Sequence, residues 1–159
     1  FYDDEQPLDA ARYEIWLRRN GVTHVALPDV PFDESSEREA QLIRSGLPYL
    51  TPVYRDDHWT VFAVRTSTGI VAGPASVVEM DGDHVVLDVT GAGASMLRVR
   101  ESPLWYVAEG AACIEPTDDG WLRVSTGVPG RVVLRQRVDV LRVIEGDTDT
   151  CAGAPGGGG

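Results

Sequence analysis

Apolar and polar residues alternate with a period of two through most of the chain after Pro52. A period of two places successive side chains on opposite faces of an extended chain, so the pattern predicts β-strands. Turn-forming Asp, Gly and Pro residues divide the pattern into about eight or nine short strands, a spacing typical of a β-sandwich. We therefore expect an antiparallel, jelly-roll-like β-sandwich.

The apolar residues before Pro52 recur instead with a helical period. Residues 7–20 predict a helix that ends before Gly21. A short β-rich run follows, and the pair Ser36 and Glu39 predicts a capping box at the start of a second helix. The apolar face expected for the first helix consists of Leu8, Ala11, Ile15 and Trp16.

These patterns predict a mainly β (α+β) chain in three parts. Residues 1–50 are expected to form a small helix–strand–helix unit that packs on the sandwich, because it is too small to stand alone. Residues 51–145 are expected to form the sandwich. Residues 146–159 are rich in glycine and are expected to form a flexible tail. No internal repeat is apparent from the sequence.

Charge narrows the range of partners. The chain has 25 acidic and 14 basic residues and a net charge of −11, which argues against binding to nucleic acid or to an anionic membrane surface. All the bases are arginine, as codon bias in a GC-rich genome would produce. The sequence starts at Phe1 rather than at a methionine, so we expect a piece of a longer protein. It has no run of ~20 apolar residues that would span a bilayer.

The two cysteines, Cys113 and Cys151, leave two interpretations open. In a reducing compartment they would be two unrelated thiols. In an oxidising compartment, a disulfide would close a loop of about 38 residues and contribute roughly 3–4 kcal/mol on the chain-entropy model. A cysteine in a glycine-rich tail has little packing reason to exist, which favours the disulfide.

The sequence offers few residues for metal or cofactor chemistry. The histidines His24, His58 and His84 are isolated, and none has the spacing of metal ligands. The segment from Gly91 to Gly93 lacks the third glycine of a dinucleotide loop, and a strand pattern follows it where a helix would be needed. We expect no metal and no cofactor.

Two pairs of carboxylates are candidates for catalysis. Asp56-Asp57 and Asp118-Asp119 each precede a predicted strand, where aspartate is common in turns. A stand-alone glycoside hydrolase would need two carboxylates placed across a cleft, which the sequence does not show. We therefore expect no catalytic residue, and the hydrolase remains as an alternative.

The aromatic residues Trp105, Tyr106 and Trp121 lie near Asp118 and Asp119 in the sequence. If exposed, the rings could stack on sugars while the aspartates bind hydroxyl groups. If buried, they are large core residues. The five residues form the candidate carbohydrate site, and the core interpretation is the favoured one for the rings.

Three segments resemble a known family. They are "YEIWLRRNGVTHVALPD", "PVYRDDHWTVFAVR" and "SPLWYVAEGAACIEPTDDGWLRVSTGVPGRVVLRQRV". Their order, with the W-x-V-F-x-V motif that starts at Trp59, S-P-x-W at Ser102 and G-W at Gly120, resembles the C-terminal extracytoplasmic domain of polytopic actinobacterial membrane proteins. Those proteins are similar to GT-C-type glycosyltransferases and to YfhO-like proteins. The resemblance covers residues 13–138.

The resemblance implies a non-catalytic accessory domain on the extracytoplasmic face of the cell membrane, because the catalytic acid of such enzymes lies in the membrane half. Its implied partners are the membrane-embedded remainder of the parent chain and a cell-wall glycan or lipid-linked sugar. The parent chain would be a cell-envelope glycosyltransferase. An oxidising compartment also favours the Cys113–Cys151 disulfide. The alternative, from another class, is a protein–protein assembly module.

Overall fold

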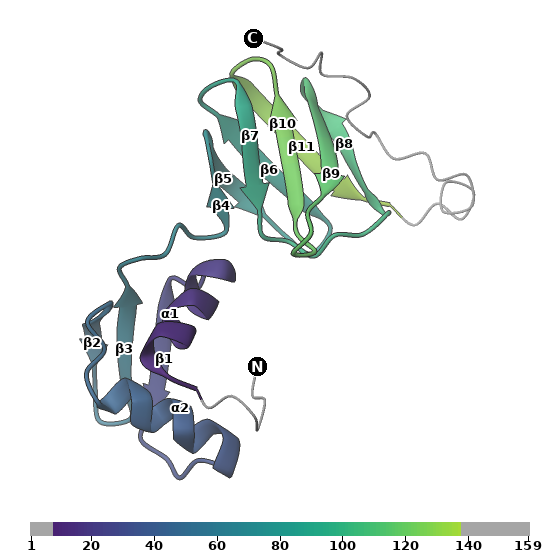
Figure 1. Cartoon of the computed structure of the whole chain (residues 1–159). Helices are drawn as coiled ribbons and strands as arrows, with labels where there is room; N and C mark the ends of the chain where they lie inside the picture. The colour runs from purple at the N-terminus through teal and green to yellow at the C-terminus, as the bar shows by residue number, and fades with distance from the viewer. Residues whose placement is uncertain (1–7, 138–159) are drawn as a thin grey trace. The chain divides into compact units, whose positions relative to one another are not determined.

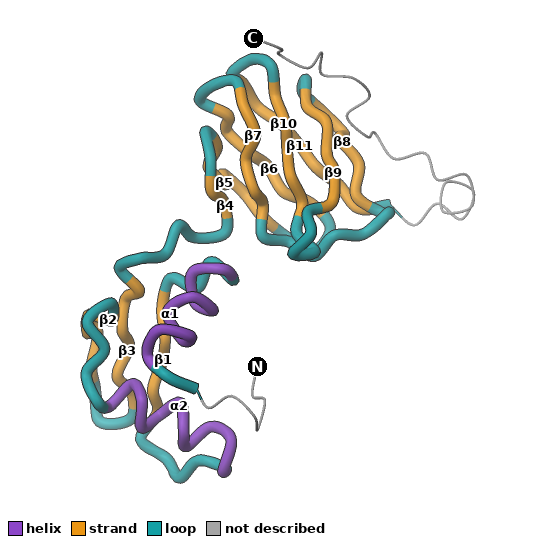
Figure 2. The backbone as a smooth tube through the Cα atoms, in the orientation of Figure 1, coloured by secondary structure: helices purple, strands orange, loops and turns teal. Residues whose placement is uncertain are grey.

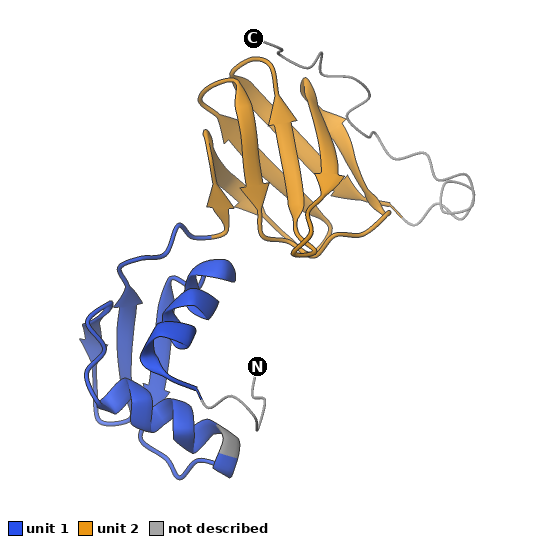
Figure 3. Cartoon of the chain, viewed as in Figure 1, with its two compact units in different colours: residues 1–69 blue, residues 70–159 orange. Residues whose placement is uncertain are grey.

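The computed structural model describes residues 8–137, apart from the side chain of Ser35. The chain forms two compact units, unit 1 at Phe1–Gly69 and unit 2 at Ile70–Gly159 (Figure 3). The described residues contain two helices and eleven strands in three antiparallel sheets, which confirms the mainly β fold. The tail predicted at 146–159 lies outside the described residues.

The boundary between the units falls after Gly69, later than the strand pattern predicted. The first two strands after residue 50, β2 (Leu50–Arg55) and β3 (Trp59–Val64), pair with β1 (His24–Pro28) in a sheet of order β1-β3-β2. They therefore belong to unit 1 rather than to the sandwich. The central place of β3 agrees with its apolar residues on both faces.

Both predicted helices are present in unit 1. Helix α1 (Ala10–Arg19) is capped by Asp9, and α2 (Glu34–Arg44) is capped by Asp33. The Asp33 carboxylate accepts the backbone N–H of Ser36 at 2.8 Å. The second helix thus starts before Ser36, the predicted cap residue, because Asp33 supplies the capping oxygen three residues earlier.

The buried face of α1 differs from the predicted one. Tyr13 and Leu17 are buried against Ile43 of α2, whereas Ile15 is 60% and Trp16 is 37% exposed. The helices cover one face of the sheet. The core between helices and sheet consists of Tyr13, Leu17, Ile43, Leu47, Tyr49, Leu50 and Val64, with Val25, Leu27 and Phe62 packed at its edge.

Tyr49 gives unit 1 a pH-dependent contact. Its hydroxyl donates a hydrogen bond to the carbonyl of Ala10 at 2.7 Å. Burial, with the nearby carboxylates of Glu14 and Asp9, raises the pKa of Tyr49 from 10.0 to about 12. The protonated form is favoured by folding, so this stabilisation is complete below pH 10 and is lost as the pH rises through about 12.

We expect Tyr49→Phe to lower the free energy of unfolding by about 1 kcal/mol at neutral pH, because one buried hydrogen bond is lost. We also expect it to reduce the loss of stability between pH 10 and pH 12. Urea unfolding followed by circular dichroism at several pH values measures both effects, with Tyr106→Phe in unit 2 as the control. An unchanged alkaline pH dependence in Tyr49→Phe would contradict this role.

Unit 2 is a β-sandwich of two four-stranded sheets, with orders β4-β7-β10-β9 and β5-β6-β11-β8 (Figures 1 and 2). The unit has two halves of four consecutive strands, β4–β7 and β8–β11. In each half the first strand pairs with the fourth and the second pairs with the third, as in a hairpin folded over on itself. The strands are β4 (Val71–Ala72), β5 (Ala75–Met80), β6 (His84–Val89), β7 (Gly93–Leu97), β8 (Trp105–Glu109), β9 (Ala112–Pro116), β10 (Leu122–Thr126) and β11 (Gly130–Gln136).

The core of the sandwich lies between the two sheets and comes from alternate positions of their strands. Leu87 of β6 and Leu134 of β11 are fully buried in one sheet, and Leu97 of β7 and Val124 of β10 are buried in the other. Antiparallel strands with one face in the core produce this alternation, although Val86 and Val133, which pair with each other on the opposite face, are also buried. The period-two pattern of the sequence therefore marks the inward-facing residues correctly.

Candidate functional site

The two tryptophans of the predicted carbohydrate site are buried. Trp105 opens β8 and is 5% exposed, and Trp121 precedes β10 and is 8% exposed. Trp105 belongs to the sandwich core, and its indole N–H donates to the carbonyl of Arg100 at 3.1 Å. Their burial agrees with the core interpretation of these rings.

Arginine side chains cover two of the aromatic rings. The guanidinium carbon of Arg100 lies 4.4 Å from the ring centroid of Trp121, and that of Arg137 lies 5.4 Å from the ring centroid of Tyr106. Both distances allow cation–π attraction. The indole N–H of Trp121 is buried and has no hydrogen-bond partner among the described residues. A sugar that stacked on these rings would have to displace the guanidinium groups.

Asp118 and Asp119 lie in the turn between β9 and β10. The turn is closed by two backbone hydrogen bonds, from Thr117 to the carbonyl of Trp121 and from Gly120 to the carbonyl of Thr117, both 2.9 Å. Asp118 is exposed and Asp119 is half-buried. Their position fits turn chemistry, and a role for them in sugar binding stays a prediction.

The predicted disulfide involves one described residue. Cys113 is half-buried in β9, where it pairs with Ser125 of β10. Cys151 lies outside the described residues. The pairing of Cys113 with Cys151 therefore stays a prediction.

Unit 1 carries a different candidate, which we call the open sheet face. Both helices pack on the side of the sheet that carries Val25, Phe62 and Val64. Side chains at the alternate positions point to the opposite side, which neither helix covers. Cross-strand pairing places these residues together: His24, Ala26, Pro28, Thr51, Tyr54, Trp59, Val61 and Ala63.

Two large aromatic side chains stand on the open sheet face. Tyr54 is 54% exposed and Trp59 is 46% exposed, and Val53, the extra residue of a bulge in β2, is 55% exposed. Tyr54 pairs with Val61, two residues along β3 from Trp59, so the two rings are diagonal neighbours. The open sheet face contains no acidic residue and no arginine.

One carboxylate fixes both aromatic residues. Oδ1 of Asp56 accepts the backbone N–H groups of His58 at 2.8 Å and of Trp59 at 2.7 Å. Oδ2 of Asp56 accepts the hydroxyl of Tyr54 at 2.8 Å. These hydrogen bonds lower the pKa of Asp56, and the bond from the backbone N–H of His58 has the largest effect. The hydrogen bond to the Asp56 carboxylate in turn raises the pKa of Tyr54. Asp56 thus holds the turn and the tyrosine ring in place.

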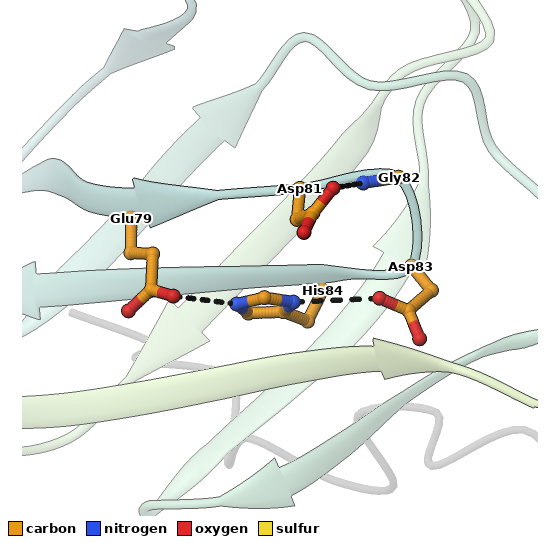
Figure 4. A network of polar contacts seen from close by, with 5 residues as sticks. All are labelled: Glu79, Asp81, Gly82, Asp83 and His84. Atoms are coloured by element: carbon orange, nitrogen blue, oxygen red, sulfur yellow. Dashed lines mark hydrogen bonds and ion pairs between the residues drawn. The ribbon is translucent and has the colours of Figure 1, made fainter.

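A second polar cluster lies on the β5–β6 hairpin of unit 2 (Figure 4). The ring nitrogens of His84 lie 3.1 Å from Oε1 of Glu79 and 3.4 Å from Oδ1 of Asp83. The two carboxylates, Glu79 first, raise the pKa of His84. The stabilisation that His84 gains from these two carboxylates is fully present below the ordinary pKa of histidine, and it is lost as the pH rises through the raised pKa of His84. The carboxylates are largely exposed, so the contribution is small.

Within residues 8–137, no group of three or more His, Cys, Asp or Glu side chains is arranged to hold a metal ion. None of the helices in that range is long and apolar enough to cross a membrane. Comparison with protein-family models, curated proteins and solved structures gave no match. The class defined by fold and site is a two-unit, mainly β chain with an exposed aromatic sheet face.

Proposed function

We propose that this chain is a non-catalytic, extracytoplasmic accessory domain of a membrane protein of the cell envelope, and that it contacts glycan through the open sheet face. The exposed pair Tyr54 and Trp59, held by Asp56, is the observation that carries the proposal. Large aromatic side chains dominate interface energetics, and an exposed apolar group of this kind is typical of a binding surface.

The chemistry of the open sheet face suits a sugar. The cross-strand partner of Trp59 is Pro28 and that of Tyr54 is Val61, and the alanines Ala26 and Ala63 lie at the diagonal positions, so both rings are larger than the side chains around them. Ring faces can pack against the C–H faces of a pyranose or furanose. The hydroxyl of Thr51 and the imidazole of His24, on the same face, supply hydrogen-bonding groups for sugar hydroxyls.

The membrane and envelope part of the proposal rests on the family resemblance. The W-x-V-F-x-V motif that carries part of that resemblance is strand β3, which supplies Trp59 and Val61 to the open sheet face. A glycan-contacting accessory domain would serve a parent glycosyltransferase by holding its acceptor or its lipid-linked donor. The parent's upstream sequence tests this part, because several apolar segments of ~20 residues are required.

An assembly module is the second candidate, because a face with exposed aromatic rings also suits a protein partner. For the hydrolase alternative, Asp56 is a poor candidate for the general acid. Three hydrogen bonds hold this carboxylate and lower its pKa, whereas a general acid needs a raised pKa.

Calorimetric titration of the chain with soluble arabinan and mannan fragments tests glycan contact. We expect saturable binding with a dissociation constant at or below the millimolar range. No binding at millimolar glycan would exclude glycan contact and leave the assembly module as the proposed function. Chemical cross-linking to the membrane half of the parent would then test that module.

We expect Asp56→Ala to weaken glycan binding by about five- to tenfold, because it releases both the Tyr54 ring and the turn before Trp59. The same titration measures the effect. Asp57→Ala, at the next exposed residue, is the matched control and should leave the affinity unchanged. Equal effects of the two substitutions would contradict the positioning role of Asp56.

A further inference from the structure

The strand pairing of the sandwich repeats itself after a shift of 37 residues. Leu87 of β6 pairs with Val132 of β11. The shift takes Leu87 forward to Val124 and takes Val132 back to Ser95, and these two residues pair between β10 and β7. The same holds for every β6–β11 pair between these ends: Val85↔Leu134 becomes Leu122↔Leu97, and Val89↔Gly130 becomes Thr126↔Gly93, both of them pairs of β10 with β7.

The hairpins repeat with the same shift. Ala75 pairs with Val89 between β5 and β6, and Ala112 pairs with Thr126 between β9 and β10. Bulges change the shift by one residue in places, as in β8, where the register slips between its pairs with Val133 and Leu134. The repeat therefore includes local pairing as well as pairing between the halves.

Two glycines give independent support. Gly73 and Gly110 are 37 residues apart and have positive φ angles of 133° and 95°. A Cβ at Gly73 would lie 2.7 Å from the Cα of Ser95, and a Cβ at Gly110 would lie 3.1 Å from the Cα of Val132. Each would also lie within 2.8 Å of the carbonyl oxygen of the residue before that partner. The same close approach of two backbones thus occurs twice.

We infer that the sandwich is an internal duplication, in which two copies of one four-stranded motif, β4–β7 and β8–β11, interlock. The shift converts the sheet β4-β7-β10-β9 into β8-β11-β6-β5, which is the other sheet in reverse order. Each sheet takes two strands from each copy, so each copy completes its core with the other (Figure 2). The surface by which one copy binds its partner therefore fits a second copy of the same motif.

An exchange of the two copies within the full chain tests this inference. The variant carries residues 105–137 before residues 70–100, joined by the native junction Glu101–Leu104 and one added glycine, with unit 1 and the tail in their usual places. In a duplicated sandwich the end of β11 is placed relative to the start of β4 as the end of β7 is relative to β8. The glycine is needed because Leu134 pairs with Val107 and Leu97 pairs with Val71, so the bulge in β8 makes the native connection one residue longer. With it, the junction should span the new connection.

We expect the exchanged chain to unfold cooperatively with a midpoint within about 10 °C of the wild type, both under reducing conditions. A second exchanged chain, with ten Gly and Ser residues added to the junction, controls for connection length. Cooperative unfolding of the sandwich in the short-junction chain, followed at the buried indole N–H groups of Trp105 and Trp121, supports the duplication. If the sandwich folds only in the long-junction chain, the two connections are not equivalent. If it folds in neither chain, the two copies cannot take each other's place. Either result overturns the inference.

Discussion

Gly110→Ala is expected to lower the free energy of unfolding of the sandwich by about 2–4 kcal/mol. The added Cβ would lie 2.5 Å from the carbonyl oxygen of Arg131, which is strand backbone and cannot move aside. The φ of 95° adds strain for any residue with a Cβ. Gly73→Ala should have a similar effect, since its Cβ would lie 2.7 Å from the backbone of Ser95.

Urea unfolding followed by circular dichroism measures both substitutions. Gly82→Ala is the matched control, because a Cβ there would meet no atom within 4 Å, and it should change the free energy of unfolding by less than about 0.5 kcal/mol. If Gly110→Ala is as well tolerated as Gly82→Ala, the close approach of the two strands is wrong. Widely different effects at Gly73 and Gly110 would weaken the equivalence of the two copies.

Trp59→Ala is expected to reduce glycan affinity at least tenfold, or about 1.4 kcal/mol, because it removes the larger of the two exposed rings. The substitution should leave unit 1 folded, since the side chain is 46% exposed. Calorimetric titration with the arabinan or mannan fragment that binds the wild type measures the loss.

Trp16→Ala is the control for Trp59→Ala. Trp16 is 37% exposed and also belongs to unit 1, but it lies on α1, away from the open sheet face. Its removal should leave the affinity unchanged. Equal losses from the two substitutions would indicate a non-specific effect, and full binding by Trp59→Ala would exclude the open sheet face.

Local periodicity predicted most of the elements but not their assignment to units. The alternation after Pro52 is that of strands, and β3 is central as its two apolar faces indicate. Which sheet it joins depends on pairing with β1, about 35 residues earlier in the chain. No local pattern carries that information, so the boundary was expected near residue 50.

The buried face of α1 shows a second limit of periodicity. Its sequence offers two apolar stripes, one through Ile15 and Trp16 and one through Tyr13 and Leu17. Both have helical spacing. The tertiary contacts with Ile43 select the second, and the first stays exposed.

The open sheet face was not predicted as a site, because the sequence pointed instead to the aromatic rings near Asp118 and Asp119. Trp105 and Trp121 are close in sequence to acidic residues, but strand packing buries both. The alternation in the sequence places Trp59 and Val61 on the same face of their strand. That this face is exposed follows only from the structure, in which the helices cover the other face of the sheet.

The duplication was hidden from the sequence for a physical reason. Its two copies share the pattern of turns and of buried positions more than they share residues. Ser95, for example, corresponds to Val132, and both are buried. Bulges also shift the spacing by one residue, which blurs a repeat of fixed length.

Glycan contact through the open sheet face of unit 1 is tested most directly by titrating the isotope-labelled chain with arabinan and mannan fragments and following the backbone and indole N–H chemical shifts. We predict that the shifts change at Tyr54, Trp59 and Val61, with the indole N–H of Trp59 among the largest. Changes centred on Trp105 and Trp121, or no changes at all, would contradict the claim.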